Sequence, residues 1–292
     1  MYKIIKKFKQ IFILVTMERF PNAFRPSSLP YVTGDTLRNY ADHIFDESKT
    51  INLKNIKYGD IIFLSSNLLE IFFRYFDPNI TQKYILITHN SDRNISVNEI
   101  KFKSNNVIHW FAQNLTVLET DNISMIPIGL ENLRWLKNGR KKWFKPKNYK
   151  KSKYILSSFN EKTNFTKREN INTNFKDISF IEIKNFENNK EYFKEFKNFK
   201  FCICPEGNGI DTHRIWESIL LKIIPIMISS DFAKNLEYNS IPCLIIKNWE
   251  ELKNYSREDL DKIYLSQLES RNFDVSLFSF WKTIIKSKQM II

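Results

Sequence analysis

Short apolar runs alternate with amphipathic segments along most of the chain, and this alternation predicts the secondary structure. The runs are rich in isoleucine, leucine and valine and do not alternate with polar residues, which is typical of strands buried on both faces of a sheet. The predicted strands are 60–65, 83–90, 107–114, 123–129, 153–158, 178–183, 200–205, 223–228 and 242–246. The predicted helices are 67–76, 97–102, 166–175, 188–199, 212–221, 231–238, 248–255, 257–270 and 274–288, and Ser256 with Asp259 forms an N-cap pair for the eighth of them. Repeated strand–helix units favour parallel sheets with right-handed crossovers.

The length of the chain favours two domains over one. Its 292 residues are 42% hydrophobic, so the chain can bury two sizeable cores. Residues 138–153 (NGRKKWFKPKNYKKSK) contain eight Lys or Arg and no apolar period, which predicts a linker or solvated loop. The expected fold class is α/β, with two Rossmann-like doubly wound domains. We expect an N-terminal domain at 1–138, a basic linker at 139–152, a second domain at 153–273 and a C-terminal helix at 274–292.

The balance of charge favours an anionic partner. The formal net charge is +13 and the sequence pI is about 9.4. Such an excess suits a nucleotide, a nucleic acid or a membrane surface, although a genomic bias toward lysine codons would produce the same excess. Within residues 138–153, Trp143, Phe144 and Tyr149 could stack bases, but charge runs are usually solvated faces. Nucleic-acid binding is therefore an alternative function, not the expected one.

The cysteines and the N-terminus indicate the compartment. Cys202, Cys204 and Cys243 have neither the number nor the spacing of a disulfide framework or zinc site, so we expect a reducing, cytoplasmic compartment. The apolar part of the N-terminus, 11–15, is too short for a span of about 20 residues, and no small-residue cleavage site follows it. We expect a short amphipathic helix or first strand there. The basic stretch 3–9 could contact an anionic membrane surface or form a solvated helix face.

The segment CPEGNGIDTHRIWESI (204–219) holds two of the chain's six glycines together with mixed charge. It follows a predicted strand, and ligands bind at the carboxyl ends of strands in open parallel sheets. Gly207 and Gly209 permit a tight turn that lets the backbone approach a ligand. Asp211 or Thr212 can cap the helix that follows, whose N-terminus offers free N–H groups to an anion. The segment therefore predicts an anion site.

Three side chains at the start of this helix extend the prediction from an anion to a nucleotide. Arg214 in the first turn can bind a phosphate bidentately, and His213 beside it could point into the cleft between the domains. Glu217, one turn later on the same face, suits the paired hydroxyls of a ribose. The alternative is a simple ion pair between Arg214 and Glu217 next to an ordinary glycine turn. We favour a nucleoside diphosphate because several polar groups converge at one junction.

Residues 202–228 (CICPEGNGIDTHRIWESILLKIIPIMI) resemble the donor-site signature of the exostosin-like glycosyltransferases of GT-B architecture. The shared features are a glycine-rich turn, a D-x-H-R helix start, a W-E pair and an apolar IPI strand, in that order. Weaker resemblance extends over most of the chain, at 25–47, 85–92, 111–132 and 157–169. The resemblance implies two domains facing each other across a cleft. It implies a sugar nucleotide in the C-terminal domain, a glycan or glycoprotein acceptor in the N-terminal domain, and a last helix that crosses back to the first domain.

The resemblance also implies site residues. Arg168 would be a further phosphate contact. The implied donor-binding set is Ser158, Asn160, Thr163, Asn164, Arg168, Pro205, Glu206, Gly207, Asn208, Gly209, Asp211, Thr212, His213, Arg214 and Glu217. The implied acceptor-binding set is Gly34, Arg38, Asn90 and Asn114. Such enzymes generally work without a bound metal, and the chain has no D-x-D motif at a strand end and no His/Cys cluster with ligand spacing. We therefore expect neither a metal nor another cofactor.

An inverting transfer needs a base that removes the proton of the acceptor hydroxyl. His89 directly follows a predicted strand, and Asp92 could be the base or could orient His89, although the turn at 90–92 could be merely structural. Asp35 is a further candidate with Arg38 beside it, but an N-cap role suits Asp35 better. His109 is expected in the core and His43 on a helix surface.

The predicted function is therefore a glycosyltransferase, inverting and metal-independent, that transfers a hexose or pentose from a UDP- or GDP-sugar to a glycan hydroxyl. The alternatives are a basic nucleic-acid-binding protein and a degenerate transferase fold that serves as a binding module. The residues leave the sugar, the nucleotide, the acceptor linkage and the oligomeric state open.

Overall fold

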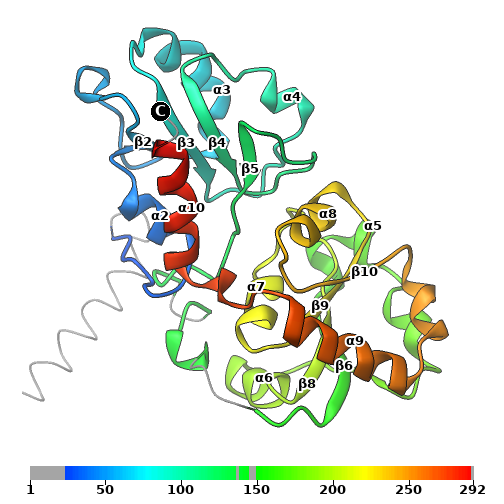
Figure 1. The fold of residues 1–292 in the computed structure, drawn as a ribbon. Coiled ribbons are helices and arrows are strands. Elements are labelled where there is room, and N and C mark those ends of the chain that lie inside the picture. Colours follow the sequence, from blue (N-terminus) through cyan, green and yellow to red (C-terminus); the bar gives the residue numbers. More distant parts are fainter. Residues whose placement is uncertain (1–23, 136–137, 145–148, 291–292) are drawn as a thin grey trace, which may run out of the picture.

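The computed structural model describes residues 24–135, 138–144 and 149–290, and they form two parallel five-stranded sheets (Figure 1). The strand order of the first sheet is β1-β2-β3-β4-β5, and that of the second is β10-β9-β8-β6-β7. The expected α/β class, with two Rossmann-like domains, is confirmed. The element expected within residues 1–20 lies outside the described residues.

The strands agree with the apolar runs, although most are shorter. They are β1 (His43–Phe45), β2 (Ile61–Ser65), β3 (Tyr84–His89), β4 (Val107–Ala112), β5 (Ile123–Met125), β6 (Lys153–Ser157), β7 (Ile181–Ile183), β8 (Phe199–Ile203), β9 (Ile224–Ile228) and β10 (Leu244–Ile246). The first strand was not predicted, because its two apolar residues, Ile44 and Phe45, stand between His43 and Asp46 and form no longer apolar run. The expectation that His43 lies on a helix surface is wrong: His43 begins β1, and its Nε2 lies 2.7 Å from Asp60 Oδ2.

Two helices have the predicted bounds, α8 (Asp231–Tyr238) and α9 (Arg257–Ser270), and Ser256 and Asp259 form a capping box at α9. The others are α2 (Gly34–Tyr40), α3 (Leu69–Ile71), α4 (Val97–Ile100), α5 (Phe165–Arg168), α6 (Asn189–Phe196), α7 (His213–Leu220) and α10 (Phe278–Met290). The helix predicted over 67–76 is a 3-10 turn, α3 and a π-helical segment in succession, and Pro78 follows it. Segment 248–255 is a 3-10 helix at Trp249–Asn254, and segment 166–175 contains α5 and a separate 3-10 helix at Asn172–Phe175.

The last helix returns to the first sheet, where it lies beside α2 (Figure 1). The Phe278 N–H donates to the carbonyl of Pro30 at 2.8 Å, and the Phe278 ring packs edge-on against Tyr40 at 5.1 Å. Trp281 and Ile285 are buried in the core, and Gln289 donates to the carbonyl of Gly59 at 2.8 Å. Apolar burial and hydrogen bonds at both ends therefore connect the end of the chain to the N-terminal half.

The basic stretch after residue 138 packs closely where it is described. Phe144 is buried, and the Trp143 ring stacks on Phe193 of α6 at 5.8 Å. The Lys151 ammonium donates to the carbonyls of Lys197 and Leu221, and burial lowers its pKa to about 7. Phe144 and Lys151 are therefore not solvated, whereas Arg140, Lys142 and Lys150 of the same stretch are exposed. The rings of Trp143 and Phe144 are occupied by protein contacts, which leaves them unavailable for base stacking.

Candidate functional site

The second sheet has a topological switch point between β6 and β8. The chain leaves β6 toward β7 on one side and continues from β8 toward β9 on the other, so the loops that follow β6 and β8 diverge. Crevices at the carboxyl ends of such strands are where ligands bind in open α/β sheets. A cavity of about 1000 Å³ lies here, which we call the C-terminal cavity; it is lined by Ser158–Thr163, Arg168, residues 185–193 in part, Cys204, Pro205, Thr212–Arg214, Glu217, Asn138 and Glu131.

Arg168 holds the glycine-rich turn to the loop after β6. Its Nε donates to the carbonyl of Glu206 at 2.7 Å, its Nη1 to that of Asn160 at 2.9 Å and its Nη2 to that of Pro205 at 3.3 Å. Asn164 adds a bond from its amide to the carbonyl of Gly207 at 2.6 Å. Three of the five guanidinium donors are therefore used on backbone, so Arg168 chiefly shapes the turn and contributes its charge to the C-terminal cavity.

Thr212 is the N-cap residue of α7, although its side chain makes no cap hydrogen bond. Asp211, the other predicted cap, does not cap the helix. The Asp211 carboxylate accepts from the indole N–H of Trp216 at 2.7 Å and from the backbone N–H of Ile128 at 2.6 Å. Burial raises its pKa to about 7, against these two bonds. Since Ile128 belongs to the N-terminal half, Asp211 links the halves of the molecule at the point where α7 begins.

Arg214 and Glu217 point into the C-terminal cavity, one turn apart on α7. Arg214 donates from Nη1 to the carbonyl of Ser158, its guanidinium lies 4.7 Å from the ring centroid of Tyr192, and its Nε lies 3.6 Å from Glu217 Oε2. Burial raises the pKa of the Glu217 carboxyl, and the charges of Arg214 and His213 oppose that rise. The predicted ion pair therefore exists, and both partners still line the cavity.

Three buried polar atoms in the wall of the C-terminal cavity have no hydrogen-bond partner among the described residues: Tyr192 Oη, Thr212 Oγ1 and Arg214 Nε. Tyr192 is 8% exposed. A buried polar group without a partner costs about 1–3 kcal/mol, so such groups normally have one. Two hydroxyl groups and a guanidinium N–H near the N-terminus of α7 could therefore donate to the oxygens of a polar or anionic ligand.

A second cavity of about 610 Å³ lies at the carboxyl ends of β3 and β4, and we call it the N-terminal cavity. Its lining is largely polar and comprises Asn67, His89–Arg93, Gln113, Ile128, Glu131, Asn132, Arg134, Trp135 and His213. The parallel pairing of Ser65 with His89 and of Thr88 with Ala112 brings these strand ends to one edge. Trp135 is 43% exposed beside the polar groups, and the Arg134 guanidinium lies 5.3 Å from its ring centroid.

His89 is fully enclosed at this edge. Its Nδ1 accepts from the backbone N–H of Asn90 at 2.7 Å, so Nε2 carries the proton and donates to the carbonyl of Pro127 at 3.0 Å. Burial lowers its pKa to about 4. Both ring nitrogens are thus engaged by the backbone, and the neutral ring fixes the turn that carries Asn90. Asp92, in contrast, is exposed at the rim of the N-terminal cavity.

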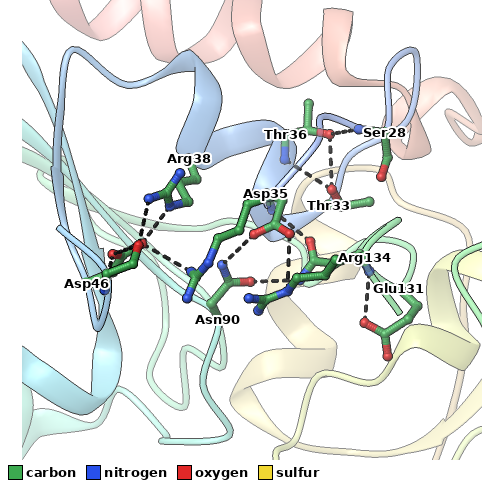
Figure 2. Close-up of polar contacts among 12 residues, drawn as sticks. Ser28, Thr33, Asp35, Thr36, Arg38, Asp46, Asn90, Glu131 and Arg134 are labelled. Carbon is green, nitrogen blue, oxygen red and sulfur yellow. Dashed lines mark hydrogen bonds and ion pairs between the residues drawn. The ribbon is translucent and has the colours of Figure 1, made fainter. Parts of the chain in front are cut away.

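Asp35 lies beneath the N-terminal cavity, fully buried, in the first turn of α2, and Thr33 is the N-cap of that helix (Figure 2). Its carboxylate lies 3.2 Å from Arg134 Nε and accepts from the Asn90 side chain at 3.3 Å. Burial raises its pKa, with Arg134 as the main opposing charge. The prediction that Asp35 is the N-cap is therefore wrong: Thr33 is the N-cap, and Asp35 is part of a buried ion pair that supports the cavity wall.

The four residues expected to bind an acceptor lie around this support, mostly out of the cavity. Arg38 is buried against Asp46, with its Nε 2.5 Å from Oδ2 (Figure 2). Gly34 leaves room for Asn90, whose φ is +58° and whose Oδ1 accepts from Asn132 at 3.1 Å. Asn114 is buried and accepts from the Asp211 N–H at 2.9 Å. Of the four, Asn90 lines the N-terminal cavity.

The donor-binding prediction divides in the same way. Ser158, Asn160, Thr163, Arg168, Pro205, Thr212, His213, Arg214 and Glu217 line the C-terminal cavity. Asn164, Glu206, Gly207, Asn208, Gly209 and Asp211 do not line it. Among them, Asn164, Glu206, Gly207 and Asp211 make hydrogen bonds that hold the turn behind the cavity. The wall formed by Asn185, Phe186, Asn188, Asn189 and Tyr192 was not predicted, because its residues belong to a different βα unit and share no motif.

The most informative omission is Glu131. It follows β5 in the stretch IPIGLEN, and its Oε2 lies 3.5 Å from His213 Nε2. Of the described residues, only Glu131 and His213 line both cavities. A carboxylate two residues after a glycine, in the loop that follows an apolar strand, is the sequence signal that could have identified it.

Within residues 24–135, 138–144 and 149–290, no group of three or more His, Cys, Asp or Glu side chains could hold a metal ion. The three cysteines are buried and unpaired with one another. In the same part of the chain, no helix combines the length and the apolar character that a membrane crossing requires.

Comparison with known proteins gives a distant likeness. No family model matches this chain, and no curated protein matches it. Among solved structures it is similar to the pneumococcal O-GlcNAc transferase GtfA in complex with UDP and GlcNAc, with a TM-score of 0.42 and 10% sequence identity. The likeness covers 81% of this chain and 58% of that protein, so this chain spans less than two thirds of its length.

Proposed function

We propose that this protein is a glycosyltransferase that moves a sugar from a nucleoside diphosphate sugar, with UDP or GDP as the nucleotide, to a hydroxyl of a glycan acceptor. The observation that carries the proposal is a set of buried polar atoms at the N-terminus of α7 and at the switch point of the second sheet. Tyr192 Oη and Thr212 Oγ1 have no hydrogen-bond partner among the described residues, and Arg214 Nε has no hydrogen bond and lies 3.6 Å from Glu217 Oε2. A diphosphate satisfies such donors, and a ribose suits the adjacent Glu217 carboxylate.

The second cavity supports transfer rather than simple nucleotide binding. It adjoins the C-terminal cavity at Glu131 and His213, so a ligand in each would meet there. Its amide side chains, Asn67, Asn90, Gln113 and Asn132, and the exposed ring of Trp135 offer hydrogen bonds and an apolar surface together. Hydroxyl-rich rings with one apolar face suit such a lining, which is the basis for a glycan acceptor.

The finer assignments are proposals that rest on the resemblance of residues 202–228 to the exostosin-like signature. We propose that the transfer inverts configuration and proceeds without a metal, with Arg214 and the N-terminus of α7 offsetting the charge of the leaving diphosphate. Activity that survives treatment with EDTA would support metal independence. We also propose the division of the chain at 1–138, 139–152, 153–273 and 274–292.

Nucleotide affinity tests the proposal directly. Thermal shift with UDP, GDP and CMP first identifies the ligand, because ~2.7 kcal/mol of stabilisation is expected at a hundredfold excess over the dissociation constant. Calorimetry then compares Arg214→Ala and Glu217→Ala with the unaltered protein. We expect the affinity to fall at least about tenfold, since a charge-assisted hydrogen bond contributes about 1.5–3 kcal/mol.

The matched control is Arg257→Ala, which removes an exposed arginine of α9 far from the C-terminal cavity. It should leave both the affinity and the cooperative unfolding transition unchanged. Unaltered nucleotide affinity in both the Arg214 and Glu217 variants would refute the assignment of the site.

A further inference from the structure

We propose that Glu131 is the general base of this protein and takes the proton of the acceptor hydroxyl at Oε2. The proposal rests on the proposed function, since a base is needed only if a hydroxyl is the nucleophile. Glu131 and His213 are the two described residues that border both cavities. The reacting atoms of two substrates, one in each cavity, must meet where the cavities adjoin.

The backbone before Glu131 is held in a conformation that suits only glycine. Gly129 has φ +68°, and its position opposite Val32 leaves no space for a side chain. The Leu130 N–H donates to the carbonyl of Val32 at 2.9 Å, which fixes the segment against the strand-like residues before α2. Glu131 is therefore presented by rigid backbone, as a reacting group requires.

One carboxylate oxygen of Glu131 is anchored and the other faces His213. Oε1 accepts from the backbone N–H of Asn132 at 2.8 Å, and Asn132 is itself held by the N–H of Asp35, which donates to its Oδ1 at 2.7 Å. Oε2 lies 3.5 Å from His213 Nε2, which is longer than a direct hydrogen bond of about 2.7–3.2 Å. The anchored side chain thus points a carboxylate oxygen toward the junction of the cavities.

The tautomer of His213 follows from its other contact. His213 Nδ1 lies 2.8 Å from the carbonyl of Gly129, and a carbonyl can only accept, so Nδ1 carries a proton. A neutral ring then presents a lone pair at Nε2 and cannot donate to Glu131. A hydroxyl in this region can therefore donate its proton to Oε2.

The other candidate bases are less well placed. Both nitrogens of His89 are occupied by backbone groups. The Asp35 carboxylate is enclosed and paired with Arg134. Asp92 is exposed, and it borders the N-terminal cavity but not the C-terminal cavity. Glu131 is the remaining carboxylate that reaches the junction from the N-terminal half.

The proposed reaction is a single displacement at the anomeric carbon of the donor sugar. The acceptor O–H bond breaks and its proton moves to Glu131 Oε2, while the acceptor oxygen forms a bond to the anomeric carbon of the sugar. The bond from that carbon to the β-phosphate oxygen breaks, and its electron pair leaves with the nucleoside diphosphate. Glu131 returns its proton to solvent afterwards.

The test compares Glu131→Gln, Glu131→Asp and Asp92→Asn with Glu258→Gln, an exposed glutamate of α9, as the matched control. Calorimetry with UDP and GDP measures nucleotide affinity. Release of nucleoside diphosphate from UDP- and GDP-hexoses, in the presence of mono- and oligosaccharides, measures turnover, and transfer to water counts as turnover. We expect Glu131→Gln to lower kcat about 10²–10⁴-fold with unchanged nucleotide affinity, and Glu131→Asp to retain more activity.

The pH profile separates a base from a residue that merely shapes the site. The unaltered protein should lose kcat as the pH falls, and the residual rate of Glu131→Gln should lack that acidic limb. Turnover of Glu131→Gln within a few-fold of the unaltered protein, or a large loss in Asp92→Asn instead, overturns the proposal. Nucleotide binding without turnover by the unaltered protein overturns it while the nucleotide site stands. No nucleotide binding overturns the proposed function as well.

Discussion

Gly209 should be far less tolerant of alanine than Gly207, although both belong to the same turn. A Cβ on Gly209 would lie 2.6 Å from Asn114 Oδ1 and 2.7 Å from Nδ2, well inside contact distance. A Cβ on Gly207 would lie 3.3 Å from a methyl of Thr212 and 3.4 Å from Arg168 Nη2, which a shift of a few tenths of an ångström relieves. Both glycines have φ outside the left-handed region, so the difference arises from packing alone.

The magnitude follows from what Asn114 would lose. Its Oδ1 accepts from the buried N–H of Asp211 at 2.9 Å, and its Nδ2 donates to the carbonyl of Ser91 at 3.1 Å. Displacement of the side chain breaks both bonds and leaves buried groups unpaired, at about 1–3 kcal/mol each. We expect Gly209→Ala to lower the free energy of unfolding by about 3 kcal/mol. We expect Gly207→Ala to change it by less than about 1 kcal/mol, since the loss of unfolded-state entropy offsets the strain.

Urea denaturation followed by circular dichroism measures both variants, and a double-mutant cycle identifies the cause. Asn114 has φ +54°, so glycine is the substitution that removes its side chain without backbone strain. If the clash with Asn114 is responsible, Gly209→Ala should cost little more once Asn114→Gly is present. Equal stability of Gly209→Ala and the unaltered protein, or additive effects of the two substitutions, would refute the reasoning.

Further predictions concern Asp211, which connects the two halves of the chain, the buried Trp281 of the last helix, and the buried histidines. Asp211→Ala should lower the free energy of unfolding by about 2–4 kcal/mol, because the Trp216 indole N–H and the Ile128 N–H lose their acceptor, and chemical denaturation measures it. Trp281→Ala should cost about 3–5 kcal/mol, whereas Trp281→Phe should cost less because the ring stays and the bond to the Val275 carbonyl is lost. His89 and His109 have pKa values lowered by burial to about 4, so each contributes stability that is complete above about pH 6.5 and is lost as the pH falls toward 4. His109→Gln removes one of these contributions, so on acidification from pH 7 to 4 its free energy of unfolding should fall less, or rise more, than that of the unaltered protein, and denaturation across this range measures the difference.

The elements of the fold could be predicted to a large extent from the sequence. Strands β2 to β10 coincide with apolar runs, and α8 and α9 have the predicted ends, because periodicity and capping residues act locally. The failures are short or irregular elements. β1 has three residues, and the segment after β2 changes from 3-10 to α to π geometry, where local pattern gives no distinct signal.

The C-terminal cavity was predicted better than the N-terminal one for a physical reason. Several of its lining residues come from one strand–turn–helix segment, so the order Pro205, Arg214, Glu217 already implies their proximity. The N-terminal cavity is assembled from the ends of several strands and from Trp135, and its residues share no local spacing. Burial also decides which of the predicted catalytic side chains can reach a substrate, and His89 and Asp35 are both buried.

What the sequence determined by itself was the order of βα units, the switch from apolar strand to glycine turn at residue 204, and the charge that follows it. What only the tertiary structure decided was the pairing of groups distant in the chain. Arg168 donates to three backbone carbonyls in two loops. Asp211 accepts from the N–H of Ile128, and Glu131 lies beside His213. Local sequence fixes a backbone conformation, but the partner of a polar side chain is chosen by whichever group the packing of two sheets and their loops brings within about 3 Å.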